Sequence, residues 1–287
     1  MEVYMNSNKL VKKSNDLIMA RYNLSVVEQK IILLIISMVD RSDKDFKQYQ
    51  FHIKDFFRLT EADSEKNHRY IKNAFEGLLK KPIKIKEKDD WIVCNWLSGA
   101  RVTTAGVVDI EIYSGLRPYL IKLKENFTRY KIRNILFLHS VYSIRIYELL
   151  KQFEKSGIKH IKISELRDIL NIPKSYETKH LKPYILEPAR RKLAEKTDIA
   201  FTYEFKKVGK KFDSIIFDIK QNGDSEIENK SQKKTKTTAI RATTPTLKDM
   251  ADSCLKRGRC YDTPVLMTRC EVCENYDEKA KWIKGDG

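Results

Sequence analysis

The sequence predicts an α+β protein in which one structural plan occurs twice. Across residues 161–220 an apolar β segment is followed by a short helix, a turn, a second helix and two strands with alternating apolar residues. Strand, helix, helix and hairpin in this order form a winged helix-turn-helix. The apolar positions recur earlier in the chain at nearly constant spacing, where Ile53, Phe56 and Leu59 correspond to Ile163, Leu166 and Ile169, and Ile71, Ala74 and Leu78 correspond to Leu186, Ala189 and Leu193. We therefore expect two tandem winged helix-turn-helix domains, followed by a small C-terminal Cys-rich segment.

The helices of the second copy have readable ends and faces. Asn171 and Pro173 end the first helix. The second helix is expected to open at Pro183, because a proline at the first helical position loses no hydrogen bond. Helical periodicity then gives an inner face of Leu186, Ala189 and Leu193, and an outer face of Tyr184, Glu187 and Arg191.

The next two strands predict a wing. From Ile199 onward apolar residues alternate along one strand and along the returning strand. The hairpin tip carries Lys206, Lys207, Lys210 and Lys211. Lysines at a tip suit the phosphate backbone of DNA, although a solvated turn explains them equally well.

The first copy is preceded by a core helix. Ser25 is the expected N-cap of that helix, and Glu28 completes a capping box. In the first copy itself, the second helix turns four polar side chains outward: Lys66, Arg69, Lys72 and Asn73. Alternating strands across residues 83–112, with Trp91, Val93 and Trp96, predict a first wing that is larger than the second.

The pattern divides the chain into five segments. Residues 117–124 and 134–153 are expected to be helices, and the second of these opens the second domain. The segment after residue 220 is rich in Lys, Thr, Ser and Asn, which is typical of a flexible linker. The expected boundaries are a basic N-terminal arm at 1–20, winged-helix domains at 21–130 and 131–220, the linker at 221–249 and the Cys-rich segment at 250–287.

Composition favours an anionic partner. The 287 residues contain 56 Lys and Arg against 39 Asp and Glu, a net charge of +17. Nucleic acid is the leading candidate and an anionic membrane surface the second. No apolar run approaches the roughly 20 residues of a bilayer span, and the N-terminus lacks the apolar core of a signal peptide. These features predict a cytoplasmic protein without membrane partners.

Four cysteines lie close together near the C-terminus. Cys254, Cys260, Cys270 and Cys273 could surround one tetrahedral Zn²⁺, which prefers thiolates in structural sites. A segment this short would need the metal for its folding free energy. A reduced, unstructured tail or redox-active thiols are the alternatives.

Catalytic motifs are missing from the sequence. There is no G-x-x-x-x-G-K-[ST] phosphate loop. The five histidines are scattered and form no H-x-H metal cluster, which a rolling-circle nickase would need together with a nucleophilic tyrosine. We therefore expect a protein that is not an enzyme, and we expect no cofactor apart from the zinc ion.

Three stretches resemble a known family. They are "NLSVVEQKIILLIISMVD", "FTRYKIRNILFLHSVYSIRIYELLKQFEKSG" and "YILEPARRKLAEKTDIAFTYEFKKVGKKFDSIIFDI". These resemble the tandem winged-helix initiator proteins of iteron-bearing, theta-replicating plasmids, from residue 6 to residue 220. The resemblance implies binding of double-stranded DNA at origin repeats, opening of the origin and recruitment of host helicase and initiator proteins. It also implies a homodimer that represses its own promoter.

The resemblance also directs attention to the second recognition helix. Family members carry a basic pair before the L-x-P-A motif, whereas this chain has Pro183 and Tyr184 there and keeps only Lys182 as the preceding basic residue. The expected DNA-contacting residues are Lys66, Arg69, Lys72, Asn73, Lys179, His180, Lys182, Tyr184, Arg191, Lys206, Lys207, Lys210 and Lys211. A transcriptional regulator on the same scaffold is the alternative function.

Overall fold

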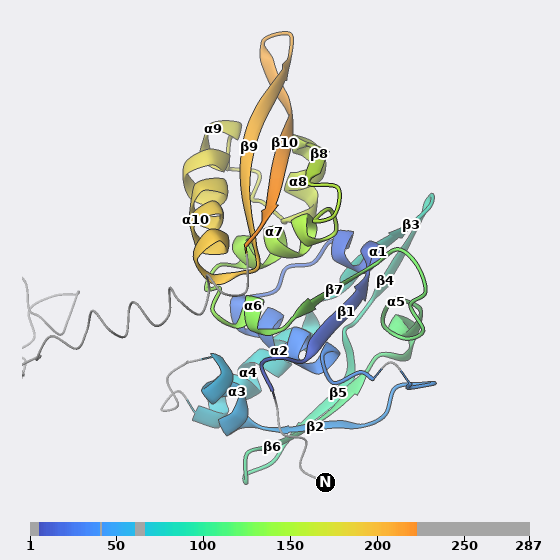
Figure 1. Cartoon of the computed structure of the whole chain (residues 1–287). Helices are drawn as coiled ribbons and strands as arrows, with labels where there is room; N and C mark the ends of the chain where they lie inside the picture. Colours follow the sequence, from blue (N-terminus) through green and yellow to red (C-terminus); the bar gives the residue numbers. More distant parts are fainter. Residues whose placement is uncertain (1–5, 41, 61–66, 223–287) are drawn as a thin grey trace, which may run out of the picture. The chain divides into compact units, whose positions relative to one another are not determined.

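The computed structural model describes residues 6–40, 42–60 and 67–222 (Figure 1). All of these residues belong to one compact unit. Lys66, the linker at 221–249 beyond Asn222 and the four C-terminal cysteines lie outside the described residues.

The first winged helix surrounds a three-stranded antiparallel sheet. The sheet has the order β2-β6-β5, so that the last strand in the sequence lies in the middle. Between β2 and the β5–β6 hairpin the chain forms two helices, of which the second is the longer. The elements are β2 (Tyr49–His52), α3 (Ile53–Thr60), α4 (Asn67–Lys80), β5 (Leu97–Val102) and β6 (Val107–Ile112).

The second winged helix repeats this topology. Its sheet has the order β8-β10-β9, again with the last strand in the middle. The elements are β8 (Ile158–Lys162), α8 (Ile163–Ile169), α9 (Thr178–Leu181), the π-helical turn η3 (Lys182–Leu186), α10 (Glu187–Lys196), β9 (Ile199–Val208) and β10 (Lys211–Gln221). The predicted repeat is confirmed, since α3 and α8 begin at the paired residues Ile53 and Ile163.

The predicted start of the second recognition helix is wrong. The helix begins at Thr178 rather than at Pro183, and Pro183 lies within the π-helical turn that connects α9 to α10. Pro183 and Pro188 both lack the backbone N–H that an α-helix interior needs, so the regular hydrogen-bond ladder is interrupted here. The recognition helix is therefore longer than expected and irregular in its middle.

The predicted first wing is two separate hairpins. β3 (Ile83–Glu87) pairs only with β4 (Asp90–Cys94) among the described strands, whereas β5 and β6 join the sheet of β2. Trp96 is 2% exposed and its ring meets Tyr22 edge to face at 5.1 Å. Burial of Trp96 and then Leu97 breaks the alternation of the strand and separates the hairpins. The wing of the first copy is thus β5–β6, and β3–β4 is an additional hairpin.

The prediction of a separate N-terminal arm at residues 1–20 is also wrong, because this segment contains a strand and a helix. β1 (Leu10–Ser14) pairs antiparallel with β7 (Phe127–Lys131), and α1 (Asn15–Met19) follows it directly. Ser14 caps α1 by accepting a hydrogen bond from the Leu17 N–H. Val11 and Lys13 are fully buried. Residues 10–19 are therefore part of the folded core.

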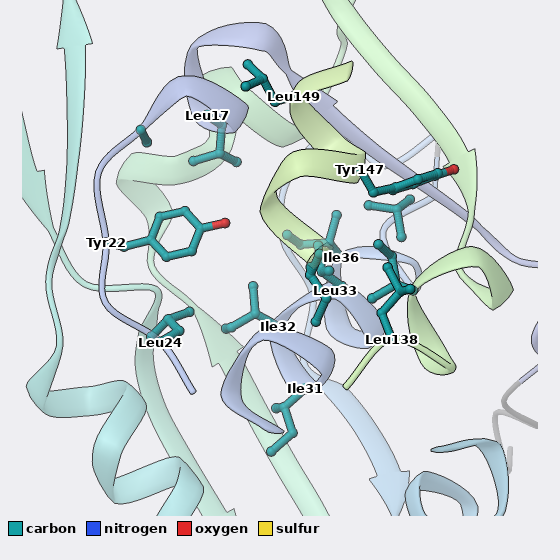
Figure 2. Close-up of a cluster of buried hydrophobic side chains, with 14 of the residues drawn as sticks. Leu17, Tyr22, Leu24, Ile31, Ile32, Leu33, Ile36, Leu138, Tyr147 and Leu149 are labelled. Atoms are coloured by element: carbon teal, nitrogen blue, oxygen red, sulfur yellow. The ribbon is translucent and has the colours of Figure 1, made fainter. Parts of the chain in front are cut away.

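A central helix organises the first part of the core. α2 (Val26–Ile36) has the predicted capping box: Ser25 accepts from the Glu28 N–H, and the Glu28 carboxylate accepts from the Ser25 N–H. Its residues from Ile31 to Ile36 are buried on all sides. Figure 2 shows side chains of this helix in one buried cluster with Leu17, Leu138 and Leu149 from other segments. Burying a Leu or Ile side chain contributes about 1.5–3 kcal/mol, so α2 is a major source of stability.

The segment between the copies is more broken than predicted. In place of the helix expected at 134–153, α6 (Arg133–Leu136) and α7 (Val141–Lys151) are separate, and Ser140 caps α7 by accepting from the Ser143 N–H. In place of the helix expected at 117–124, η2 (Ser114–Leu116) leads into the short α5 (Arg117–Leu120). α7 contacts α1 and β7 as well as α10. It therefore bridges the N-terminal elements and the second winged helix.

Candidate nucleic-acid interface

The first candidate surface is the outer face of α4. Ile71, Ala74 and Leu78 are buried, so helical periodicity turns the predicted residues outward. Arg69, Lys72 and Asn73 are exposed. Their side chains form no ion pair or hydrogen bond with other described residues. The face therefore carries donors that no other described residue occupies.

The second candidate surface is the outer face of α9, η3 and α10. Lys182, Tyr184 and Arg191 are exposed, with Tyr184 at 62%. Lys179 is exposed as well, although its ammonium pairs with Glu177 at 3.0 Å. Exposed ion pairs contribute about 0–1 kcal/mol, so a phosphate could displace Glu177 at little cost.

Glu187 does not belong to this outer face. Its carboxylate accepts hydrogen bonds from the Tyr203 hydroxyl at 2.6 Å and from Arg190 at 2.9 Å. These bonds hold the pKa of Glu187 below its ordinary value. The predicted outward role of Glu187 is therefore corrected: it fastens α10 to strand β9 of the wing.

Three aromatic rings gather at the start of the recognition helix. The His180 ring lies 5.8 Å from the rings of both Tyr176 and Tyr184. His180 Nδ1 also accepts a hydrogen bond from the Glu177 N–H at 3.0 Å. Tyr176 was missed because nothing in the sequence marked a helix start at Thr178. The cluster presents ring surface of the kind that meets thymine methyl groups in a major groove.

The wing of the second copy is a long hairpin with a basic tip. Gly209 has φ +61°, a left-handed conformation that suits a glycine in this turn. Lys206 pairs with Glu204 at 2.7 Å, and the Lys207 ammonium lies 4.8 Å from the centre of the Phe212 ring. Lys210 and Lys211 are exposed and make no such contact with the described part of the chain. The tip is positioned by Phe205 and Phe212, whose rings lie 5.3 Å apart.

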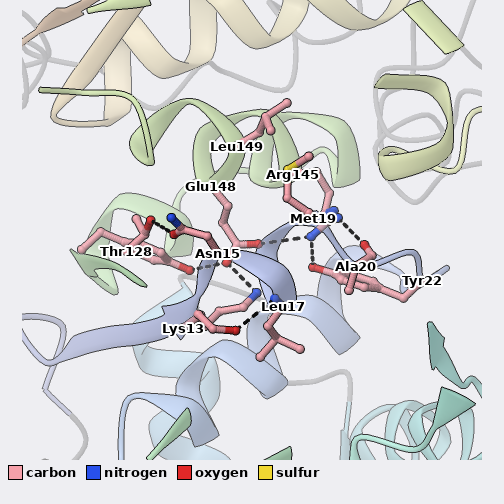
Figure 3. Close-up of polar contacts among 12 residues, drawn as sticks. Lys13, Asn15, Leu17, Met19, Ala20, Tyr22, Thr128, Arg145, Glu148 and Leu149 are labelled. Atoms are coloured by element: carbon pink, nitrogen blue, oxygen red, sulfur yellow. Dashed lines mark hydrogen bonds and ion pairs between the residues drawn. The ribbon is translucent and has the colours of Figure 1, made fainter. Parts of the chain in front are cut away.

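A buried polar network joins the N-terminal elements to α7 (Figure 3). Lys13 Nζ lies 2.8 Å from Glu148 Oε1, and the Tyr130 hydroxyl donates to the same oxygen at 2.6 Å. Arg145 Nη2 donates to the carbonyl of Ala20 at 2.8 Å. A short hydrogen bond also joins Arg145 to the Tyr22 hydroxyl.

The same helix α7 is bonded to the second winged helix. Arg145 Nη2 donates to the carbonyl of Ile169 in α8 at 3.2 Å. Asp198, between α10 and β9, accepts from the Tyr147 hydroxyl at 2.9 Å and from Lys151 Nζ at 2.8 Å. Buried charges are expensive unless they are paired, so these contacts define one arrangement of α7.

The described residues hold neither a metal cluster nor a membrane-spanning helix. No group of three or more His, Cys, Asp or Glu side chains there could hold a metal ion. None of the helices in the described ranges is long and apolar enough to cross a membrane.

Two winged helices, each with an exposed polar and basic second helix, define a DNA-binding protein with tandem winged-helix domains. The sequence matches the family model "Initiator Replication protein, WH1" over residues 10–151 and the model "Initiator Rep protein, WH2" over residues 162–219. The chain therefore belongs to the family of initiator replication proteins, as the resemblance predicted. It is a sequence-specific DNA-binding replication initiator, and the family models favour this function over that of a transcriptional regulator.

Individual relatives agree with this family. A replication initiation protein of Escherichia coli is 23% identical over 226 residues, which cover 74% of this chain and 70% of that protein. An uncharacterized 27.6 kDa protein of Escherichia coli is 26% identical over 233 residues, covering 75% of this chain and 98% of that protein.

A solved structure shares the fold. It is the Pi initiator protein in complex with iteron DNA, with a TM-score of 0.65 and 16% identity; the match covers 76% of this chain and all of that one. At this identity the likeness supports the fold alone. The shared fold agrees with the tandem winged helices described above.

Proposed function

We propose that the chain binds direct repeats in a replication origin through both winged helices. The observation that carries the proposal is the duplicated topology, in which each copy exposes a recognition helix whose polar donors include several that no described residue occupies. The Pi initiator, which shares the fold, was solved with iteron DNA. Because the two recognition faces carry different residues, the site has a direction and need not be a palindrome.

The proposal extends to the steps after DNA binding. A repeat-bound initiator would help to open the origin and recruit a host helicase and host initiator protein, and a homodimer would repress the promoter. Footprinting of the purified protein on the DNA upstream of its own gene tests the first step. Protection of tandem direct repeats beside an A·T-rich tract is expected, whereas protection of one isolated inverted repeat would contradict the proposal.

Substitutions in the wing and in the recognition helices should have different effects. Replacing Lys207 and Lys210 with Ala should weaken binding to all sequences alike and lower the salt slope by about 0.9 for each phosphate that is no longer neutralised. By contrast, Arg69→Ala or Arg191→Ala should cost about 1–3 kcal/mol on the cognate repeat and less on random DNA, because these side chains are assigned to base edges.

Fluorescence anisotropy on cognate and random duplexes, repeated at several salt concentrations, measures both effects. Lys155→Ala is a suitable control, since this exposed lysine lies on neither recognition helix nor on the wing. Equal losses of affinity on cognate and random DNA for all four side chains would show that the base-contacting residues are wrongly assigned.

The zinc site remains a proposal for residues that the structure does not describe. Purified full-length protein should carry about one zinc ion per chain. Replacing Cys270 and Cys273 with Ser should remove it, while Cys94→Ser should not. Metal analysis by mass spectrometry tests this, and equal zinc content in all three proteins would refute a site built from the four C-terminal cysteines.

A further inference from the structure

A cavity of about 270 Å³ is lined by residues that belong neither to a recognition helix nor to the second wing. It is formed by β1, the end of α2, α5 and the segment from α5 into β7. The apolar part of its lining is largely aliphatic and the polar part is mostly cationic. The lining residues are Ile36, Val39, Leu120, Leu123 and Phe127, then Lys12, Lys122, Lys124 and Arg129, with Asp40 as the one carboxylate. We call it the α5–β7 pocket.

The cations of the α5–β7 pocket are arranged against their own electrostatics. Lys12 and Arg129 are direct cross-strand partners in the β1–β7 pair, so their side chains lie on the same face. Like charges directly opposite each other destabilise a strand pair. Lys12 has an electrostatic attraction to the lining carboxylate Asp40. Among the described residues, none of the four cationic side chains forms an ion pair or a hydrogen bond, so one carboxylate offsets four cations. An anion in the pocket would remove this repulsion.

The segment that contributes Lys122 and Lys124 is held in an unusual conformation. Lys122 and Asn126 have φ values of 55° and 51°, in the left-handed region that residues with a side chain rarely adopt. The Asn126 carbonyl accepts a hydrogen bond at 2.7 Å from the N–H of Asn15, which lies in α1. Strained backbone persists where its surroundings fix it, so the backbone that carries Lys122 and Lys124 is fixed before a ligand arrives.

We propose that the α5–β7 pocket binds an acidic peptide segment of a partner protein. An apolar side chain of the segment occupies the aliphatic floor, and neighbouring carboxylates meet Lys122, Lys124 and Arg129. The charge is complementary, and carboxylates form charge-assisted hydrogen bonds with both lysine and arginine. The volume is below the roughly 300–1,000 Å³ of pockets that enclose a whole small molecule, but it suits one anchoring side chain.

The lining distinguishes this partner from single-stranded nucleic acid. Grooves for single strands combine cations with several aromatic rings on which bases stack. Phe127 is the single aromatic residue lining the α5–β7 pocket, and the other apolar residues there are aliphatic. The pocket therefore goes beyond the proposed recognition of origin repeats.

The test uses the full-length protein and a defined probe. The probe is a fluorescein-labelled peptide of twelve residues in which Asp and Glu flank a central Leu-Leu pair. Replacing Lys122 and Lys124 with Glu should weaken its binding about tenfold or more, because two attractions become repulsions. The matched control replaces Lys86 and Lys155 with Glu, which changes the net charge equally at exposed lysines outside the pocket. The control should bind the peptide within about twofold of wild type.

Three further measurements decide the outcome. Leu123→Asn should weaken binding of the acidic peptide. Its thermal unfolding midpoint should stay close to that of wild type, which excludes a folding defect. A peptide with Ser in place of the Leu pair should bind weakly, and equal binding would overturn the anchored mode. Binding of an oligothymidine that depends on Lys122 and Lys124, together with no binding of the peptide, would overturn the proposal in favour of a phosphate site. Equal weakening in the pocket and control variants would overturn it as well.

Discussion

Replacing Glu148 with Ala should lower the free energy of unfolding by about 3–5 kcal/mol, the largest effect expected of a single substitution described in this chain. The carboxylate is fully buried and lies between Lys13 and Arg145, which are themselves buried. Its removal leaves two cations without a counter-charge and the Tyr130 hydroxyl without its acceptor. Urea unfolding followed by circular dichroism measures the destabilisation.

Two comparisons separate the network from a general effect of losing a glutamate. Glu204→Ala removes an exposed carboxylate that pairs with Lys206, and should cost about 0–1 kcal/mol. Combining Lys13→Met with Glu148→Leu should recover only part of the stability: it replaces one buried pair by apolar side chains, but Arg145 still lacks its counter-charge. A cost for Glu148→Ala no larger than that for Glu204→Ala would contradict the role of the network.

The same carboxylate predicts a dependence on pH. Burial by itself would raise the pKa of Glu148, but Lys13, Arg145 and the hydrogen bonds from Lys13 and Tyr130 outweigh it and hold the pKa below its ordinary value of 4.5. A pKa that is lower in the folded chain gives stability that is complete above about 4.5 and lost as the pH falls through the folded value. The stability gap between wild type and Glu148→Gln should therefore shrink below about pH 4.5, and a gap constant down to pH 3 would contradict this.

The repeated plan could be predicted because it depends on local periodicity. Apolar spacing found the two helices of each copy, and the spacing of Ser25 and Glu28 found the capping box that the structure confirms. β1 could not be predicted, because Lys13 interrupts the apolar alternation. Glu148, which pairs with Lys13, is 135 residues further along the chain, and only the folded structure shows this ion pair.

The candidate interface also contains residues that the sequence predicts and residues that only the folded structure shows. Exposure of Arg69, Lys72 and Arg191 followed from the burial of their helical neighbours, which a sequence pattern reports. The contact of Tyr176 with His180 could not be predicted, because it depends on the helix starting at Thr178. The α5–β7 pocket needed the register of β1 against β7, which places Lys12 opposite Arg129. Strand register between distant segments is a tertiary property.

Insertion of five base pairs at the centre of one origin repeat should reduce binding by roughly 100-fold or more, to the level of a single winged helix. One chain presents two recognition helices, and a pair that reads one face of a duplex must dock about one helical turn, 10–10.5 base pairs, apart. Five base pairs turn half of the repeat to the opposite face. The two winged helices cannot rotate apart to match it without breaking the buried hydrogen bonds that join α7 to Ala20 and Ile169.

The control for this prediction is the same insertion placed just outside the repeat, which should leave the affinity unchanged. An insertion of ten base pairs restores the face but adds a full turn of separation, so it should also weaken binding and thereby distinguish distance from rotation. Hydroxyl-radical footprinting of the wild type should show two protected grooves on the intact repeat and one on the five-pair insertion. With the insertion present, Arg69→Ala and Arg191→Ala should no longer both matter, because only one helix remains docked. Undiminished affinity for the inserted repeat would show that one winged helix alone reads the DNA.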